Sequence, residues 1–146
     1  MSTETVHSDI SIAAEAGAVL AVLLDVEDYP SWAKAVKSVR VLTHDDDGRP
    51  GDVEFEVAPG PLPRMRYVLR YGYGDNRISW DYVEGDMRDL RGSYVLTQAD
   101  DDSTTVVYEL AIDPGTIPLP GFVKARAARE ITKVALQELK RRVERA

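Results

Sequence analysis

The stretch MRYVLRYGYGDNRISWDYV, residues 65–83, decides the fold of this chain. Every second residue from Met65 to Tyr71 is apolar or aromatic, a period of two that is typical of a strand with one buried face. The same alternation runs from Ile78 to Tyr82, after the turn signal at residues 74–76. Because so short a turn joins antiparallel strands, the stretch predicts a β-hairpin with one aromatic face.

Similar runs flank this hairpin on both sides. Each is an alternating segment bounded by Gly, Pro or Asp, which indicates a strand that ends in a turn. The short turns that join the runs make successive strands antiparallel neighbours. The predicted strands span residues 6–12, 36–43, 52–58, 65–73, 77–83, 90–98 and 104–112.

Three helical segments complete the chain. Residues 13–24 are rich in Ala, Leu and Val and predict a short helix, and residues 30–35 predict a second, because proline suits a first helical turn. From residue 121 to residue 144, apolar side chains recur every three or four positions, which is typical of one long amphipathic helix. We therefore predict an α+β fold in a single domain, residues 1–146: a seven-stranded curved antiparallel sheet around a long C-terminal helix, with two short helices after strand one.

The composition narrows the classes of function. The 146 residues have a net charge of −7, which argues against nucleic-acid binding because that function needs a basic surface. Residues 121–146 nevertheless carry eight Lys/Arg and three Asp/Glu, and this basic helix is either a solvated surface or a contact for an acidic partner. Cysteine is absent, which excludes disulfides and thiolate chemistry. The acidic start lacks the features of a signal peptide and residues 16–24 are too few to span a bilayer, so we expect a cytoplasmic protein without a transmembrane segment.

The inward faces of the predicted strands carry more aromatic side chains than a simple core requires. One helix cannot cover the whole concave side of a curled sheet, so we expect an apolar cavity there, the alternative being a core that these large rings fill. Strand parity places its opening where the loops 59–63, 84–89 and 114–121 meet, and Leu62, Ile117 and Leu119 on these loops are expected to meet a ligand, a partner surface or the core. The predicted ligand-binding residues are Trp32, Val36, Phe55, Met65, Tyr67, Leu69, Tyr71, Trp80, Tyr82, Tyr94, Leu96, Tyr108, Phe122 and Arg126.

Few side chains suit catalysis. His7 and His44 lack the partners of a hydrolytic triad and have no metal-ligand spacing, so we expect no metal and no other cofactor. Arg70, Tyr82 and Arg126 are weak catalytic candidates, because an inward arginine or tyrosine polarises a carbonyl group. The alternation, however, places Arg70 on the charged outer face of the sheet.

The segment Asp25-Val26-Glu27-Asp28-Tyr29-Pro30-Ser31-Trp32 resembles a signature of the START/Bet-v-type helix-grip superfamily (SRPBCC), in its polyketide cyclase/dehydrase and coenzyme-Q-binding branches. Asp113-Pro114-Gly115, followed by Ile117-Pro118, is similar too, and the resemblance extends from about Thr3 to Arg145. It implies an apolar ligand between the sheet and the terminal helix. Aromatase/cyclases of this type rely on pocket arginine and tyrosine residues, whereas Ala35-Val36 stands where those enzymes carry a tyrosine.

Three functions stay open at this point. The first is binding or transport of a hydrophobic small molecule, such as a lipid, an isoprenoid or quinone, or a polyketide-like compound. The second is catalysis as a polyketide aromatase/cyclase or dehydratase. The third is a protein-interaction module that uses the basic C-terminal helix, with transient membrane or protein contact. We expect a ligand-binding protein in preference to an enzyme.

Overall fold

The computed structural model describes residues 4–58, 63–115 and 120–145. The seven strands lie within two residues of their predicted bounds. The helical segments are α1 (Ala16–Leu24), the 3-10 helix η1 (Val26–Ser31) and the long helix α2 (Gly121–Arg145). The strands are β1 (Glu4–Ile12), β2 (Val36–Val41), β3 (Asp52–Val57), β4 (Met65–Gly74), β5 (Arg77–Gly85), β6 (Asp89–Asp100) and β7 (Ser103–Asp113).

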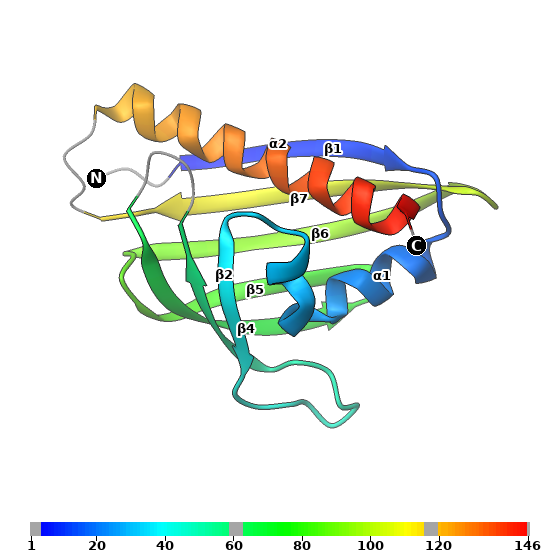
Figure 1. Ribbon diagram of the computed structural model, residues 1–146, viewed down its shortest axis with the longest axis horizontal. Coiled ribbons are helices and arrows are strands. Elements are labelled where there is room, and N and C mark those ends of the chain that lie inside the picture. Colours follow the sequence, from blue (N-terminus) through cyan, green and yellow to red (C-terminus); the bar gives the residue numbers. More distant parts are fainter. Residues whose placement is uncertain (1–3, 59–62, 116–119, 146) are drawn as a thin grey trace.

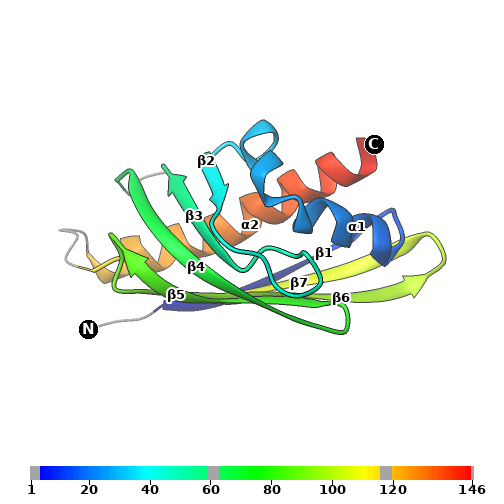
Figure 2. The same cartoon turned by 90° about the horizontal axis from the view of Figure 1, so that it is seen from below.

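The strands form one antiparallel sheet in the order β1-β7-β6-β5-β4-β3-β2. In the β4–β5 hairpin, Tyr71 pairs with Trp80, and the turn contains Asn76 at a φ of 51°. Asparagine tolerates this left-handed conformation better than most residues do. Twisted strands make a large sheet curl, and Figure 2 shows β2, β3 and β4 rising from the rest of the sheet toward α2.

Helix α2 crosses the concave side of the sheet and packs mainly on β1 and β7 (Figure 1). The side chains that it buries change in size along its length. Ala127 and Ala128 are buried in its first half, whereas Leu136, Leu139 and Val143 are buried in its second half. The larger side chains fill the space over the sheet where α2 approaches α1, and the small Ala127 leaves space nearer the start of the helix.

The second short helix lies earlier in the chain than predicted. It spans Val26–Ser31 as a 3-10 helix, in place of residues 30–35. Val26 and Tyr29 are both buried, and their spacing of three matches the three residues per turn of a 3-10 helix. The Tyr29 hydroxyl donates a hydrogen bond of 2.5 Å to the Leu23 carbonyl, which anchors this segment to the end of α1.

Candidate ligand-binding site

A cavity of about 570 Å³ lies between the concave face of the sheet and α2. Its volume falls within the range of small-molecule sites. The inward side chains of β3 to β7 form its floor and walls, because alternate residues of a strand share one face. The residues of β3 to β7 that line it are Phe55, Val57, Tyr67, Leu69, Tyr71, Trp80, Leu90, Tyr94, Tyr108, Leu110 and Ile112, and Val36 and Lys37 line it from β2.

Helix α2 covers the cavity with small and branched side chains. Ala127, Ile131, Val134 and Ala135 all line it, and the two alanines are the reason that the helix does not fill the space. Val134 is 36% exposed, so it lies at the edge of the cavity where solvent enters. Because an apolar guest here contacts both the helix and the sheet, it is removed from water on most sides.

A glycine lets the largest ring of the wall lie flat against the sheet. Gly92 on β6 pairs with Trp80 on β5, and a Cβ atom at Gly92 would stand 2.6 Å from Trp80 Cζ2. The indole ring therefore occupies the space above this glycine. From there it contacts Tyr71, Tyr94 and Tyr108 at ring-centroid distances of 6.0, 5.4 and 5.9 Å. The result is a continuous aromatic wall across four neighbouring strands, β4 to β7.

Four tyrosines place hydroxyl groups in this aromatic wall: Tyr67, Tyr71, Tyr94 and Tyr108, hereafter the cavity tyrosines. Burial raises the pKa of each of them above its ordinary value of 10.0. The hydroxyls of the cavity tyrosines therefore stay protonated and neutral at physiological pH, and act as hydrogen-bond donors. A further donor, the indole N–H of Trp32, is buried and has no hydrogen-bond partner within the described residues.

Charged groups lie at the border of the cavity and balance one another. Lys34 lines it from the segment before β2, Lys37 lines it from the start of β2, and Glu130 and Glu138 line it from α2. The Lys34 backbone N–H donates a hydrogen bond of 3.1 Å to the Glu138 carboxylate. This contact joins the segment before β2 to α2 across the cavity, although 104 residues separate the two partners in the chain.

Nine of the fourteen predicted ligand-binding residues line the cavity. These residues share an inward position on a strand or on the segment that precedes β2. They are Trp32, Val36, Phe55, Tyr67, Leu69, Tyr71, Trp80, Tyr94 and Tyr108.

The other five do not line it. Met65 and Leu96 face inward but are packed into the buried core. Tyr82 lies past the last β5–β6 pair, Trp80–Gly92, and its hydroxyl donates to the Met87 carbonyl at 2.7 Å. Phe122, 75% exposed, and Arg126, also exposed, lie on the outer side of α2, opposite the stripe that contains Ala127. The loop residues Leu62, Ile117 and Leu119 fall outside the described residues.

Several lining residues were missed. Leu110 and Ile112 alternate with Tyr108, and Ala127, Ile131 and Ala135 follow the helical period of α2, so the patterns contained these positions. No pattern indicated Lys34, Lys37, Ala58, Met87, Glu130 or Glu138, which reach the cavity from turns, from the start of β2 or from the flank of the apolar stripe.

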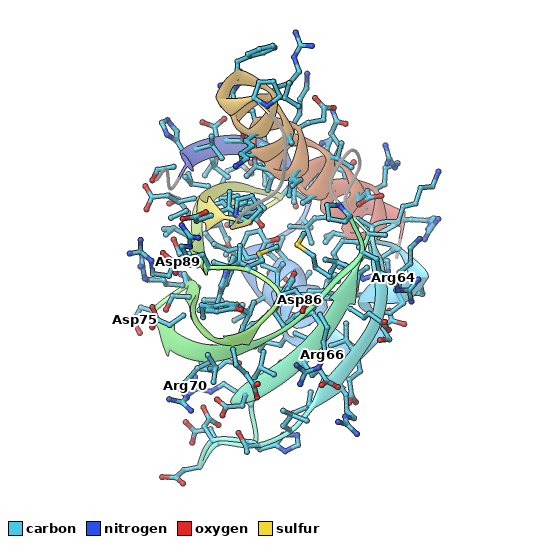
Figure 3. All side chains as sticks on the ribbon, turned by 90° about the vertical axis from the view of Figure 1, so that its left-hand side faces the viewer. Arg64, Arg66, Arg70, Asp75, Asp86 and Asp89 are labelled. Carbon is cyan, nitrogen blue, oxygen red and sulfur yellow. The ribbon has the colours of Figure 1, made fainter. Side chains whose placement is uncertain are left out.

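Arg70 lies on the outer face of the sheet, as the alternation predicts. Its guanidinium donates two hydrogen bonds of 2.9 and 3.1 Å to Asp52, and its side chain is 65% exposed. Figure 3 shows it on the side of the sheet that faces away from α2. Further pairs on the same face join Glu54 to Arg40 and Arg66. Neighbouring strands thus carry opposite charges on their solvated face.

The described residues contain no group of three or more His, Cys, Asp or Glu side chains suited to hold a metal ion. No helix among them has the length and apolarity that crossing a membrane requires.

A seven-stranded antiparallel sheet curled around a C-terminal helix, with an apolar cavity between them, defines a protein of the helix-grip fold. Within that class, the chain belongs to the family described as polyketide cyclase / dehydrase and lipid transport, whose model matches residues 3–144. This description covers enzymes and lipid-transport proteins alike. A comparison with curated proteins finds no match.

Solved structures share the fold over nearly the whole chain. A START superfamily protein from Mycobacterium smegmatis is 23% identical, with 99% of each chain covered and a TM-score of 0.90. The Zhui aromatase/cyclase from Streptomyces sp. R1128 is 17% identical, with 99% of this chain and 95% of that one covered and a TM-score of 0.76. A STAR-related lipid transfer protein from Xanthomonas axonopodis is 17% identical, with 95% and 85% covered and a TM-score of 0.73.

Proposed function

We propose that this protein binds a hydrophobic small molecule in the cavity between the sheet and α2, as a carrier or binding protein. The observation that carries the proposal is the cavity of about 570 Å³ with its aromatic wall. The family description includes lipid transport, and a lipid transfer protein is among the solved structures of the same fold. Both support the proposal.

The expected affinity follows from the apolar area that leaves water. A guest that buries roughly 300 Å² of its own apolar surface, against a similar area of the wall, gains about 15 kcal/mol at 25 cal/mol per Å². Association costs about 8 kcal/mol, near the middle of its accepted range. The difference of about 7 kcal/mol corresponds to a Kd of about 10 μM.

Filling the cavity tests the proposal. The probe is N-phenyl-1-naphthylamine, a neutral apolar fluorophore, titrated into the purified protein and followed by its emission. Ala135→Phe places a ring in the cavity, because Ala135 lines it, and Gln137→Phe adds the same ring at an exposed position of the same helix. We expect Ala135→Phe to weaken probe binding at least tenfold and Gln137→Phe to change it less than twofold. Equal affinity of the two variants, with both folded by circular dichroism, would contradict the proposal, as would a wild-type protein that does not bind the probe.

Native mass spectrometry of protein purified from cells adds a second test. A carrier retains part of its apolar cargo, so we expect a reproducible additional mass that disappears after organic extraction. A protein that is persistently empty would count against the carrier function.

Catalysis as an aromatase/cyclase or dehydratase is the second candidate. The family description and the solved aromatase/cyclase of the same fold favour it, and the cavity tyrosines supply hydroxyls that polarise a carbonyl group. The outward position of Arg70 removes the arginine that this candidate would use. The cytoplasmic location, and the basic helix as a protein-interaction surface, stay predictions.

A further inference from the structure

The seven tyrosines of the chain fall into two groups by the partners of their hydroxyls. Tyr29, Tyr73 and Tyr82 each donate to a backbone carbonyl, at 2.5, 2.6 and 2.7 Å. Within the part of the chain that the structure describes, none of the cavity tyrosines has a backbone partner. The hydroxyls of Tyr94 and Tyr108 lie near each other, and those of Tyr67 and Tyr71 make no hydrogen bond to a described residue.

The cavity tyrosines are largely shielded from bulk water. Tyr67 and Tyr108 are each 8% exposed, Tyr71 and Tyr94 are half-buried, and all four line the cavity. The ring centroids of Tyr94 and Tyr108 are 4.5 Å apart, and Tyr67 stacks on Phe55 at 5.6 Å. Their hydroxyls therefore belong to a packed wall, and the molecule that occupies the cavity decides whether their hydrogen bonds are made.

An occupant without oxygen leaves these donors unmatched. A pure hydrocarbon displaces water from the hydroxyls and returns no hydrogen bond, which costs free energy for each buried donor. A carbonyl or ether oxygen accepts the bond that water would have made. A site with buried donors therefore discriminates against the analogue that lacks the acceptor more strongly than it discriminates by size.

The charges at the cavity favour a neutral occupant. Lys34 and Lys37 are matched by Glu130 and Glu138, so these four groups together carry no net charge. A carboxylate placed among the cavity tyrosines would lose its hydration in exchange for neutral phenol donors, which is unfavourable for an unpaired charge.

We infer that the cavity tyrosines select a neutral, ring-containing molecule that carries hydrogen-bond-accepting oxygens, over both hydrocarbons and carboxylates of the same shape. This inference rests on the proposed function, because it names the class of ligand for the same cavity. The ring component is matched by the aromatic wall, where Trp80 and its tyrosine neighbours offer ring faces and edges.

Three probes of one shape test the inference: fluorene, a hydrocarbon; 9-fluorenone, its ketone; and fluorene-9-carboxylate, an anion. Their affinities are measured by quenching of tryptophan fluorescence in the wild type and in four single Tyr→Phe variants, one for each cavity tyrosine. Each variant removes one hydroxyl and keeps the ring. Tyr73→Phe is the matched control, since its hydroxyl bonds to Pro50 and Tyr73 does not line the cavity.

We expect at least one cavity variant to bind 9-fluorenone about five- to tenfold more weakly, the effect of one lost hydrogen bond. The same variant should bind fluorene as tightly as the wild type or more tightly, and Tyr73→Phe should change neither affinity. Fluorene-9-carboxylate should bind the wild type at least tenfold more weakly than the ketone. Because each variant is compared with the wild type for the same probe, the greater hydrophobicity of fluorene does not affect the effect of a substitution.

Each other outcome has a defined meaning. If the wild type binds the neutral probes but no cavity variant separates the ketone from the hydrocarbon, the inference fails and the proposed function stands. Tighter binding of the carboxylate than of the ketone also overturns the inference. If neither neutral probe binds the wild type, the proposed function fails and the inference fails with it.

Discussion

Gly92→Ala is expected to destabilise the protein because two neighbours occupy the space that the new methyl group needs. A Cβ atom at residue 92 would stand 2.6 Å from Trp80 Cζ2 and 2.6 Å from the Glu109 carbonyl oxygen. The first neighbour is a side chain that can turn into the cavity. The second is backbone of the adjacent strand β7 and moves only with the sheet. Alanine therefore forces both the aromatic wall and the β6–β7 ladder to shift.

Overpacking of this kind costs about 1–3 kcal/mol, and the backbone clash puts Gly92→Ala in the upper part of that range, about 2–3 kcal/mol. For a chain of this length the loss corresponds to a fall in Tm of about 5–10 °C. The matched control is Gly72→Ala on β4, whose nearest neighbour would be the Ser79 Oγ at 3.3 Å, the end of a small side chain. We expect that control to lie within about 1 kcal/mol of the wild type.

The assay is urea unfolding of Gly92→Ala, Trp80→Leu and the double variant. Trp80→Leu removes the indole ring from the space above residue 92, so Gly92→Ala should cost at least about 1 kcal/mol less in that background, a coupling typical of residues in contact. The remaining cost reports the Glu109 carbonyl. Equal stability of Gly92→Ala and Gly72→Ala would refute the reasoning, because only Gly92 has an aromatic ring and a carbonyl within 3 Å of the added carbon.

Two further predictions concern charge. Burial raises the pKa of the cavity tyrosines and of Tyr29, so above pH 10 these groups ionise in the unfolded chain before the folded one. Stability should therefore be level below pH 10 and then fall as pH rises toward the folded pKa values, by about 1.4 kcal/mol per pH unit for each group. The four cavity tyrosines alone contribute about 5 kcal/mol per pH unit. Urea midpoints between pH 8 and 11, with phenolate absorbance at 295 nm, measure this, and unchanged midpoints up to pH 11 would contradict it. Arg70→Gln removes an exposed ion pair with Asp52, so it should cost less than about 1 kcal/mol and leave probe affinity unchanged. A large loss of probe binding would instead show that Arg70 contributes to the cavity and would favour the cyclase candidate.

The wall of the cavity could be predicted from sequence wherever the ladder between strands is regular. In β4 and β7, alternation assigns every second side chain to one face, and Tyr67, Tyr71 and Tyr108 line the cavity as predicted. The rule depends on unbroken pairing. Beyond Trp80, β5 no longer pairs with β6, and the β4–β5 register shifts between Val68 and Leu69. Tyr82 pairs with Leu69, so it lies beyond the last β5–β6 pair and directly beside the register shift, and no local pattern contains either irregularity.

The border of the cavity could not be predicted, because it depends on contacts between distant segments. Glu138 lies beside the apolar stripe of α2, where the helical period alone suggests a solvated side chain. It reaches the Lys34 amide only because the sheet brings the segment before β2 against the helix. Phe122 shows the reverse case: an apolar residue near the predicted opening lies exposed, because the inward stripe of α2 passes through Ala127 and Ile131.

The state of the cavity tyrosines bears on the choice between carrier and cyclase. Burial keeps their hydroxyls protonated well above neutral pH, so they donate hydrogen bonds and polarise a carbonyl, but they do not accept a proton from carbon. They therefore provide the acid half of a cyclisation and no base. The carboxylates that line the cavity are Glu130 and Glu138, and Glu138 already accepts the Lys34 N–H. Recognition of a carbonyl group requires only hydrogen-bond donors, whereas removal of a proton requires a base beside the reacting carbon. The cavity has hydroxyl donors inside and carboxylates at its border. This arrangement meets the requirement for binding a carbonyl compound and favours the carrier.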